Sequence, residues 1–282
     1  MTNFDKVRTY YKHFDEKNRL VDNCHGRLEY MITIDILKEY LPESGTVLDL
    51  GGGAGIYSFP LAEEGYRVVL ADLSPDLIEQ AKQQKEESGA ANLIACDIVN
   101  ATDLGMYADG QFDAVLLLGP LYHLIEESER KQCVSEVYRV LKPGGTVIAS
   151  YIPWATGSVS IVDRYFRDPR QVNIECLKEV FRSGRFNNQA VWGFQEGYYP
   201  SSDEIEELFR SCGFSKKLIR SIRGFGFGRE EMICGLEEKD PEMFNIIIGL
   251  INQTAEDKAI IETCCHAVYI GTRHKQAFGE IA

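Results

Sequence analysis

The sequence has no long apolar run, no paired cysteine motif and no excess of positive charge. Its longest unbroken apolar stretch, Ala114–Leu118, is far shorter than the roughly 18 residues that a membrane-spanning helix needs. The first residues, Met-Thr-Asn-Phe-Asp-Lys, lack the basic start and the following apolar run of a signal peptide. We therefore expect a cytoplasmic protein without membrane segments.

The eight cysteines are scattered along the chain, and no two of them form a Cys-x-x-Cys pair. Without a signal peptide, this usage is typical of free buried thiols rather than of a disulfide framework or a zinc site. Cys264 and Cys265 are adjacent and would point to different sides of any regular element. This argues against metal chelation there, and we expect no metal site.

The charge is strongly acidic, with 43 Asp and Glu against 30 Lys and Arg and a net charge of −13. Binding to nucleic acid needs a positive footprint, because phosphate neutralisation supplies most of the affinity. This balance argues against an RNA or DNA partner without excluding a local basic patch.

One segment departs from the acidic balance, since residues 151–185 hold six basic side chains against four acidic ones. Arginine forks suit carboxylates and phosphates, so a small anionic ligand is one interpretation. The alternative, which we prefer, is a solvated helix face with internal ion pairs. The basic residues are Arg164, Arg167, Arg170, Lys178, Arg182 and Arg185.

Between residues 45 and 151, short apolar runs alternate with helix-like segments. Near-continuous apolar strands separated by helices are typical of a parallel sheet that is covered on both faces. Ser74 and Pro75 mark the start of one helix, as N-cap and first helical residue. The pattern predicts a doubly wound α/β core. The expected strands are 46–50, 67–71, 92–96, 112–118 and 146–151, with helices over 56–64 and 126–141 and a turn at 142–145.

The flanking segments differ from this core. Residues 1–40 show helical spacing of apolar side chains, whereas residues 152–200 contain two tryptophans, many arginines and no clear strand. The core resumes with a helix over 203–211, whose expected N-cap is Ser202. A strand near 218–222, a helix from 241 to about 264 and a strand over 267–271 follow. We expect one domain over 1–282, with a core of about 41–151 and 201–282 and cap segments of about 1–40 and 152–200.

A glycine cluster follows the first expected strand, with glycines at positions 51, 53 and 55. Glycines at the carboxyl end of a strand let the backbone turn tightly and approach a ligand. The dinucleotide fingerprint Gly-x-Gly-x-x-Gly fails in this register, because Ile56 stands at the last glycine position. A nicotinamide dehydrogenase is therefore disfavoured. A tight strand–helix turn without a ligand is the structural alternative.

Acidic residues close the next two strands. Asp72 lies about 20 residues beyond the glycine loop, where a carboxylate can accept both hydroxyls of a ribose. Asp97 ends the third strand, where a carboxylate could accept from an adenine amino group. Each alone is more often a helix cap or a solvated strand end. Together with the loop, they indicate a pocket for an adenosine without a pyrophosphate.

The order and spacing of five motifs resemble class I S-adenosylmethionine-dependent methyltransferases. The motifs are Leu48-Asp-Leu-Gly-Gly-Gly-Ala-Gly55, Ala71-Asp-Leu-Ser74, Cys96-Asp-Ile98, Phe112-Asp-Ala-Val with Gly119-Pro-Leu-Tyr-His-Leu124, and Val140-Leu-Lys-Pro-Gly-Gly145. The likeness covers about residues 45–151, and the last two expected strands suit the family's final pair, one of them antiparallel. It implies a Rossmann-like, seven-stranded, mostly parallel sheet with a helical cap.

For the methionine end of the cofactor, the resemblance implies that Gly51 and Gly53 let the loop pass close to it. Asp49 would orient that loop or meet the amino group. The backbone at Leu118 and Gly119 would lie near the same amine.

For the adenosine end, the resemblance implies that Asp72 holds the ribose and that Leu73 packs on the adenine. Asp97 and Ile98 would border the adenine on its other side. Tyr11, on the apolar face of the first expected helix, is our candidate for an aromatic contact with the sulfonium. Packing of that helix is the competing interpretation.

The activated methyl group of S-adenosylmethionine needs mainly an aligned nucleophile, with S-adenosylhomocysteine as the product, and the cap segments would exclude water. His123 is the candidate base, although a hydrogen-bonded packing role is the interpretation that we prefer for it. We expect methyl transfer to O, N or S of a small-molecule acceptor. The alternatives are an RNA or protein methyltransferase and a non-catalytic adenosine-binding protein.

Overall fold

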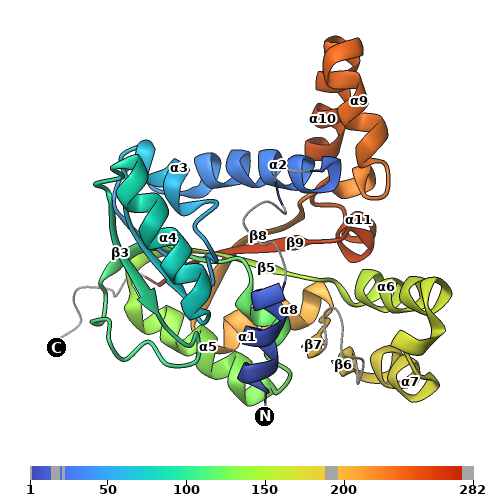
Figure 1. Ribbon diagram of the computed structural model, residues 1–282, viewed down its shortest axis with the longest axis horizontal. Helices are drawn as coiled ribbons and strands as arrows, with labels where there is room; N and C mark the ends of the chain where they lie inside the picture. Colours follow the sequence, from blue (N-terminus) through green and yellow to red (C-terminus); the bar gives the residue numbers. More distant parts are fainter. Residues whose placement is uncertain (1, 14–19, 21–22, 188–195, 275–282) are drawn as a thin grey trace, which may run out of the picture.

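The computed structural model describes residues 2–13, 20, 23–187 and 196–274. Within these residues, seven strands form one sheet in the order β3-β2-β1-β4-β5-β9-β8 (Figure 1). Every pairing is parallel except those of β9, which is antiparallel to both of its neighbours. The strands are β1 (Thr46–Leu50), β2 (Arg67–Asp72), β3 (Leu93–Ile98), β4 (Phe112–Leu117), β5 (Leu141–Tyr151), β8 (Phe214–Ser221) and β9 (Ala267–Arg273). The expected doubly wound, mostly parallel sheet is confirmed.

The strand order reverses between β1 and β4, which lie side by side at the centre of the sheet. From β1 the chain builds outward through β2 and β3, and from β4 it continues on the other side to β5, then to the edge strand β8 and back to β9 between them. Connections that leave in opposite directions open a crevice at the carboxyl ends of the two central strands. The fold therefore opens this crevice where the glycine loop follows β1.

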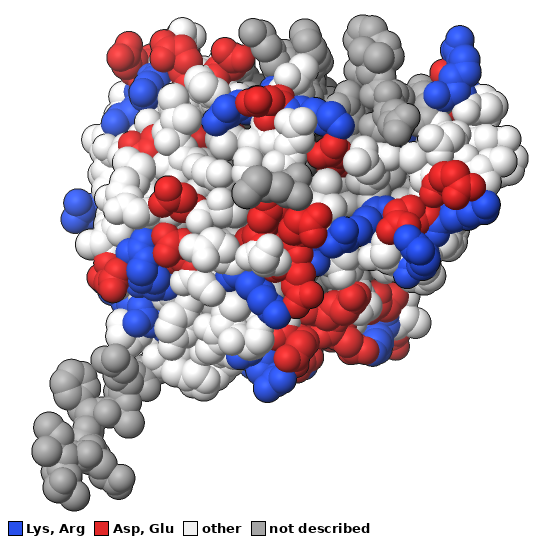
Figure 2. Space-filling view, turned by 90° about the horizontal axis from the view of Figure 1, so that it is seen from below, with Lys and Arg blue, Asp and Glu red and all other residues white. Residues whose placement is uncertain are grey.

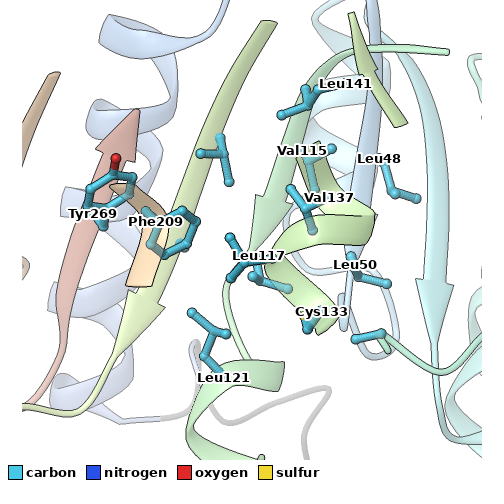
Figure 3. Close-up of a cluster of buried hydrophobic side chains, with 14 of the residues drawn as sticks. Leu48, Leu50, Val115, Leu117, Leu121, Cys133, Val137, Leu141, Phe209 and Tyr269 are labelled. Atoms are coloured by element: carbon cyan, nitrogen blue, oxygen red, sulfur yellow. The ribbon is translucent and has the colours of Figure 1, made fainter. Parts of the chain in front are cut away.

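Helices cover both faces of the sheet. Alternate residues of a strand point to opposite faces, so Leu48 and Leu50 pack toward α5 and α8, whereas Val47 packs toward α2, α3 and α4. Figure 3 shows Leu48, Leu50 and Leu117 packed with Cys133 and Val137 of α5. These helices are α2 (Cys24–Tyr40), α3 (Ser58–Glu63), α4 (Pro75–Ser88), α5 (Glu127–Val140) and α8 (Ser202–Ser211). None of the described helices is long and apolar enough to span a bilayer.

The segment between β5 and α8 forms a separate small layer beside the sheet (Figure 1). It contains α6 (Trp154–Arg167), α7 (Ile174–Ser183) and the antiparallel pair β6 (Arg185–Asn187) and β7 (Glu196–Tyr198). It has its own buried apolar cluster around Val180, Phe186 and Tyr199. The sequence showed no clear strand here, because strands of three residues are too short to show an alternating pattern.

The helices of the carboxyl-terminal third differ from the expected ones in two ways. The single helix expected over 241–264 is two helices, α10 (Pro241–Gln253) and α11 (Lys258–Thr263), and Asp257 caps the second one through the backbone N–H groups of Ala259 and Ile260. A further helix, α9 (Glu230–Lys239), precedes them. In Figure 1, α9 and α10 project together from the body of the molecule.

Two local expectations need correction. The N-cap of α8 is Ser201 rather than Ser202, and Ser201 and Glu204 form a reciprocal capping box. The segment from Lys142 to Gly145, expected as a turn, lies within β5 at an irregularity in its pairing with β4.

Phe209 offers a test of the core on one face of the sheet. Its ring is fully buried and stacks on Tyr269 with ring centroids 4.1 Å apart. Phe209→Ala should lower the free energy of unfolding by about 3–5 kcal/mol, because it removes a buried ring and leaves a cavity. Chemical denaturation measures the change, and Phe166→Ala, at a ring that is 79% exposed, is the matched control. Equal losses in the two variants would contradict this packing.

Candidate active site

A cavity of about 300 Å³ lies at the carboxyl ends of the central strands. Its walls come from the glycine loop after β1, the end of β2, the segment after β3, the segment after β4 and α1 (Phe4–His13). This is the crevice that the reversal of strand order creates. The sequence analysis predicted a ligand pocket at this edge of the sheet, from the residues that follow the first three strands.

The glycine loop adopts a backbone that other residues rarely adopt. Gly51, Gly53 and Gly55 have φ angles of 77°, 59° and 94°. A Cβ on Gly51 would also lie 2.6 Å from the ring of Pro120, and one on Gly52 would lie 2.5 Å from the carboxyl group of Asp49. The loop therefore needs glycine both for its conformation and for its close packing.

Asp49 is a buried carboxylate in the cavity wall and is 1% exposed. Its Oδ2 accepts a hydrogen bond of 2.7 Å from the hydroxyl of Ser58. Its Oδ1 is buried without a hydrogen-bond partner among the described residues. Burial raises the pKa of Asp49 to about 6. Such an oxygen is suited to a cationic hydrogen-bond donor on a ligand.

Asp72 lies at the end of β2 and is 9% exposed. Its Oδ2 accepts the N–H of Gly53 at 2.9 Å, and its Oδ1 accepts the N–H of Ser74 at 2.8 Å. Burial raises its pKa in spite of these two bonds. Each carboxylate oxygen keeps a lone pair, so Asp72 ties the glycine loop to β2 and can still accept from a ligand.

The structure does not bring Asp97 and Ile98 into the cavity wall. Asp97 accepts a hydrogen bond of 3.0 Å from the hydroxyl of Tyr107, and the side chain of Ile98 is 53% exposed. The next three residues, Val99, Asn100 and Ala101, line the cavity instead. The reason is that β3 runs to residue 98, two residues beyond its expected end, so the chain turns toward the cavity later.

The segment after β4 contributes both expected and unexpected wall residues. Leu118, Gly119 and His123 line the cavity as expected, and Tyr122 joins them. His123 is 7% exposed, and burial lowers its pKa to about 3. The imidazole is therefore neutral at pH 7 and a weak proton acceptor. Tyr122 lies within the motif Gly119-Pro-Leu-Tyr-His-Leu124, but the sequence analysis did not predict it as a site residue.

The first helix closes the side of the cavity at the end of β2. Phe4, Val7 and Arg8 of α1 line the cavity together with Leu73, and the Nε of Arg8 donates to the carbonyl of Leu73 at 3.3 Å. Tyr11 lies in α1, but its side chain is outside the described part of the structure.

An anchor at Thr2 holds α1 in place. Its N–H donates to the carboxylate of Glu129 at 3.0 Å, and its hydroxyl accepts the N–H of Ile125 at 3.0 Å. Thr2 is 5% exposed. The start of the chain is thereby fixed to the beginning of α5.

The basic residues of the 151–185 segment do not line the cavity. Four of them pair with acidic residues, three within the segment as the solvated-face interpretation expects and one, Arg185, with Glu126 outside it. The pairs are Arg170 with Asp168, Lys178 with Glu175, Arg182 with Glu179, and Arg185 with Glu126.

Comparison with known proteins gives methyltransferases for the part of the chain that contains the glycine loop and the central strands. Residues 48–149 match the family model of a methyltransferase domain. A glycine/sarcosine N-methyltransferase of Parasynechococcus marenigrum is 34% identical over 49% of this chain and 48% of its own. A demethylmenaquinone methyltransferase of Clavibacter sepedonicus is 26% identical over 78% and 83%. A tRNA 5-carboxymethoxyuridine methyltransferase of Escherichia coli is 31% identical over 40% and 42%.

Solved structures support the fold. The PH0226 protein of Pyrococcus horikoshii superimposes with a TM-score of 0.64 and 18% identity, covering 94% of this chain and 98% of its own. The sequence match to the glycine/sarcosine N-methyltransferase spans about half of that relative's length, whereas the match to the demethylmenaquinone enzyme spans most of it. The segment that matches the family model contains β1 to β5 and the glycine loop.

The buried carboxylate of Asp49 predicts a pH dependence of stability. Its pKa is about 6 in the folded protein and 3.8 when unperturbed, so the folded state holds the proton to higher pH. Its ionisation therefore destabilises the ligand-free fold as pH rises. Between pH 5 and pH 8, wild type should lose on the order of 1.5 kcal/mol relative to Asp49→Asn.

Urea denaturation of both proteins at several pH values measures this difference. Subtraction at each pH cancels the titration of the other groups. If the free energies of unfolding of the two proteins changed with pH in the same way, Asp49 would not have a raised pKa in the folded state.

Proposed function

Because the chain belongs to the class I S-adenosylmethionine-dependent methyltransferases, we propose that it transfers the methyl group of this cofactor to O, N or S of a small, mainly apolar acceptor. The observation that carries the proposal is the cavity at the β1–β4 reversal, where buried carboxylates and a glycine loop adjoin an apolar wall.

The residues present fit the cofactor. The buried Oδ1 of Asp49 lacks a partner in the described structure and suits the ammonium of a methionine group. The remaining lone pairs of Asp72 suit a ribose diol. We assign the glycine loop and Gly119 to the methionine chain, with Leu118 beside them. Leu73 would pack on the adenine.

The adenine would also contact residues that the sequence did not single out. Val99, Asn100 and Ala101 take the place in the wall that was expected for Asp97 and Ile98. Arg8 and Phe4 of α1 would cover the same end. We keep Tyr11 as a candidate contact to the sulfonium because of its place in α1.

When bound, the cofactor supplies a methyl group activated by positive charge on sulfur. The chain's own task is then to align the acceptor and to exclude water. Because burial keeps His123 neutral, it can accept a hydrogen bond from the acceptor and orient it. Its pKa of about 3 suits this positioning role better than the role of a general base.

The described wall near the segment after β4 supports an apolar acceptor. Leu20, Pro120, Tyr122 and Leu124 line it with apolar and aromatic groups. Arg8 is the cationic side chain among the described wall residues, and it donates to Leu73 on the adenosine side. An anionic acceptor would bury its charge without a described partner, which is costly.

Surface charge supports a small acceptor over RNA. On the face shown in Figure 2, Lys and Arg side chains lie among Asp and Glu side chains and form no continuous basic surface. The net charge of −13 acts in the same direction. The relatives include enzymes named for glycine, demethylmenaquinone and tRNA, so an acceptor panel must contain all three classes.

Cofactor binding tests the adenosine side. Asp72→Asn removes the charge that would accept the ribose hydroxyls, while keeping the shape of the side chain. Affinity for S-adenosylhomocysteine should fall by at least about tenfold, because each charge-assisted bond contributes roughly 1.5–3 kcal/mol. Isothermal titration calorimetry measures the affinity, and Asp76→Asn, at an exposed carboxylate of α4, is the control. Equal affinity in wild type and Asp72→Asn would remove Asp72 from the site.

Methyl transfer tests the acceptor class. With tritiated methyl donor, we expect label in phenolic, quinol or heteroaromatic acceptors and little label in glycine or tRNA. The apolar wall gives the physical reason, because it compensates neither a free carboxylate nor phosphates. Preferred labelling of glycine or tRNA would overturn the apolar assignment. Tight cofactor binding without transfer to any member would favour the non-catalytic alternative.

A further inference from the structure

Tyr122 lies in the cavity wall after β4, and two imidazole rings pack on its ring. Its ring centroid lies 4.8 Å from that of His123 and 6.0 Å from that of His266. Its hydroxyl lies beside the backbone of Gly119, since a Cβ built there would lie 3.7 Å from the hydroxyl oxygen. Gly119 also lines the cavity, and we assign it to the methionine end of the cofactor. Under that assignment, the hydroxyl of Tyr122 lies at the end of the cavity where the methyl group is transferred.

A buried ion pair holds His266 in place. Its Nδ1 lies 3.0 Å from Oε2 of Glu29 in α2, and the two side chains are 15% and 9% exposed. The Nε of Arg223 lies 3.6 Å from the same carboxylate oxygen, and the Nη1 of Arg223 lies 2.6 Å from Oε1 of Glu230. Arg223 lies between β8 and α9, and His266 immediately precedes β9. These contacts therefore connect three separate parts of the chain to the imidazole that packs on Tyr122.

The charges of this group favour a protonated His266. Glu29 and Glu230 are two buried carboxylates, whereas Arg223 is a single buried guanidinium. Burial alone would lower the pKa of His266, but the charge of Glu29 is the largest opposing effect, and the pKa rises to about 10. The other oxygen of Glu230 lies 3.0 Å from Nδ1 of His25, which is 57% exposed. His266 is thus an imidazolium at pH 7, paired with a carboxylate that also lies against Arg223.

We propose, on the basis of the proposed function, that Tyr122 contacts the methyl acceptor and that Glu29 and His266 position Tyr122. The hydroxyl oxygen of Tyr122 accepts a hydrogen bond from the O–H or N–H of the acceptor, and this bond orients a lone pair of the reacting atom toward the methyl group. Tyr122 takes up no proton in this role. An O-methylated product has lost the donor, so the site binds the product more weakly than the acceptor.

This hydrogen bond needs a ring that is held in one orientation. Hydrogen bonds weaken steeply as their angle departs from linear, so a ring that turns loses most of the contact. Tyr122 is half-buried, and the imidazoles of His123 and His266 pack on its ring. The competing interpretation is that Glu29 and His266 only join α2 to the start of β9. Loss of a purely structural pair would weaken the binding of every acceptor alike, whereas loss of a positioning pair removes the preference for a hydrogen-bond donor.

Two probes measure this preference: 2-naphthol, which donates a hydrogen bond, and 2-methoxynaphthalene, its methyl ether, which cannot. Each is titrated by fluorescence into protein saturated with S-adenosylhomocysteine at pH 7. Wild type should bind 2-naphthol about threefold to tenfold more tightly than the ether, because one hydrogen bond contributes a difference of this size. Absence of saturable 2-naphthol binding would overturn the placement of Tyr122 in an acceptor site.

Variants separate the hydroxyl from the pair that positions it. Tyr122→Phe keeps the ring and should bind the two probes within about twofold of each other. Glu29→Gln and His266→Asn should each reduce the preference for 2-naphthol to about twofold or less, while the affinity for S-adenosylhomocysteine changes by less than about twofold. Arg220→Gln is the matched control, because it removes another buried polar contact, 2.7 Å long, to Asn252 and should keep the wild-type preference.

An unchanged preference in Tyr122→Phe would overturn the contact with the acceptor, and an unchanged preference in both Glu29→Gln and His266→Asn would overturn the positioning role. If these two variants fail to fold by circular dichroism, Glu29→Asp, which keeps the charge and shortens the side chain, takes their place with the same expected loss. Failure of wild type to bind S-adenosylhomocysteine would overturn the proposed function and this inference together. Normal cofactor binding without the probe preference would overturn this inference alone.

Discussion

The buried carboxylate of Asp49 is the charge that the glycine loop, α3 and the end of β1 enclose. It lies at the end of β1, where the strand order reverses, and the glycine loop folds so tightly beside it that a Cβ on Gly52 would clash with its carboxyl group. Asp72 fastens the same loop to β2 through the N–H of Gly53. A buried anion with one unpartnered oxygen is unfavourable in the ligand-free fold. A cationic ligand relieves this cost, so stability and binding are coupled at one atom.

The strands and the glycine loop could be predicted because they depend on local sequence. Runs of apolar residues define β1, β2 and β4, and positions 51 and 53 require glycine for backbone reasons that operate within a few residues. The position of Asp97 could not be predicted, because it depends on where β3 ends. The end of β3 is set by its pairing with β2, which continues as far as Asp72 opposite Ile98. The apolar pattern of one strand contains no information about this pairing.

Contacts between distant parts of the chain were not predictable at all. Glu29 and His266 are 237 residues apart and meet only because α2 packs on the sheet near the start of β9. Their local sequence indicates nothing unusual, since a glutamate in a helix and a histidine before a strand are ordinary surface residues. The small layer around Phe186 and Tyr199 was hidden for a related reason. Its strands contain three residues each, and packing rather than pattern defines them.

The first helix has a consequence for the order of events in a catalytic cycle. Its residues Phe4, Val7 and Arg8 form part of the cavity wall, and the anchor at Thr2 fixes it to α5. Opening of this anchor would free that side of the cavity, so the residence time of a bound adenosine cofactor would depend on a few hydrogen bonds at Thr2. The proposed acceptor wall is a different part of the cavity, near Tyr122. Because each cofactor molecule carries one methyl group for transfer, the spent cofactor must leave before the next transfer, and the anchor would therefore open once in every turnover.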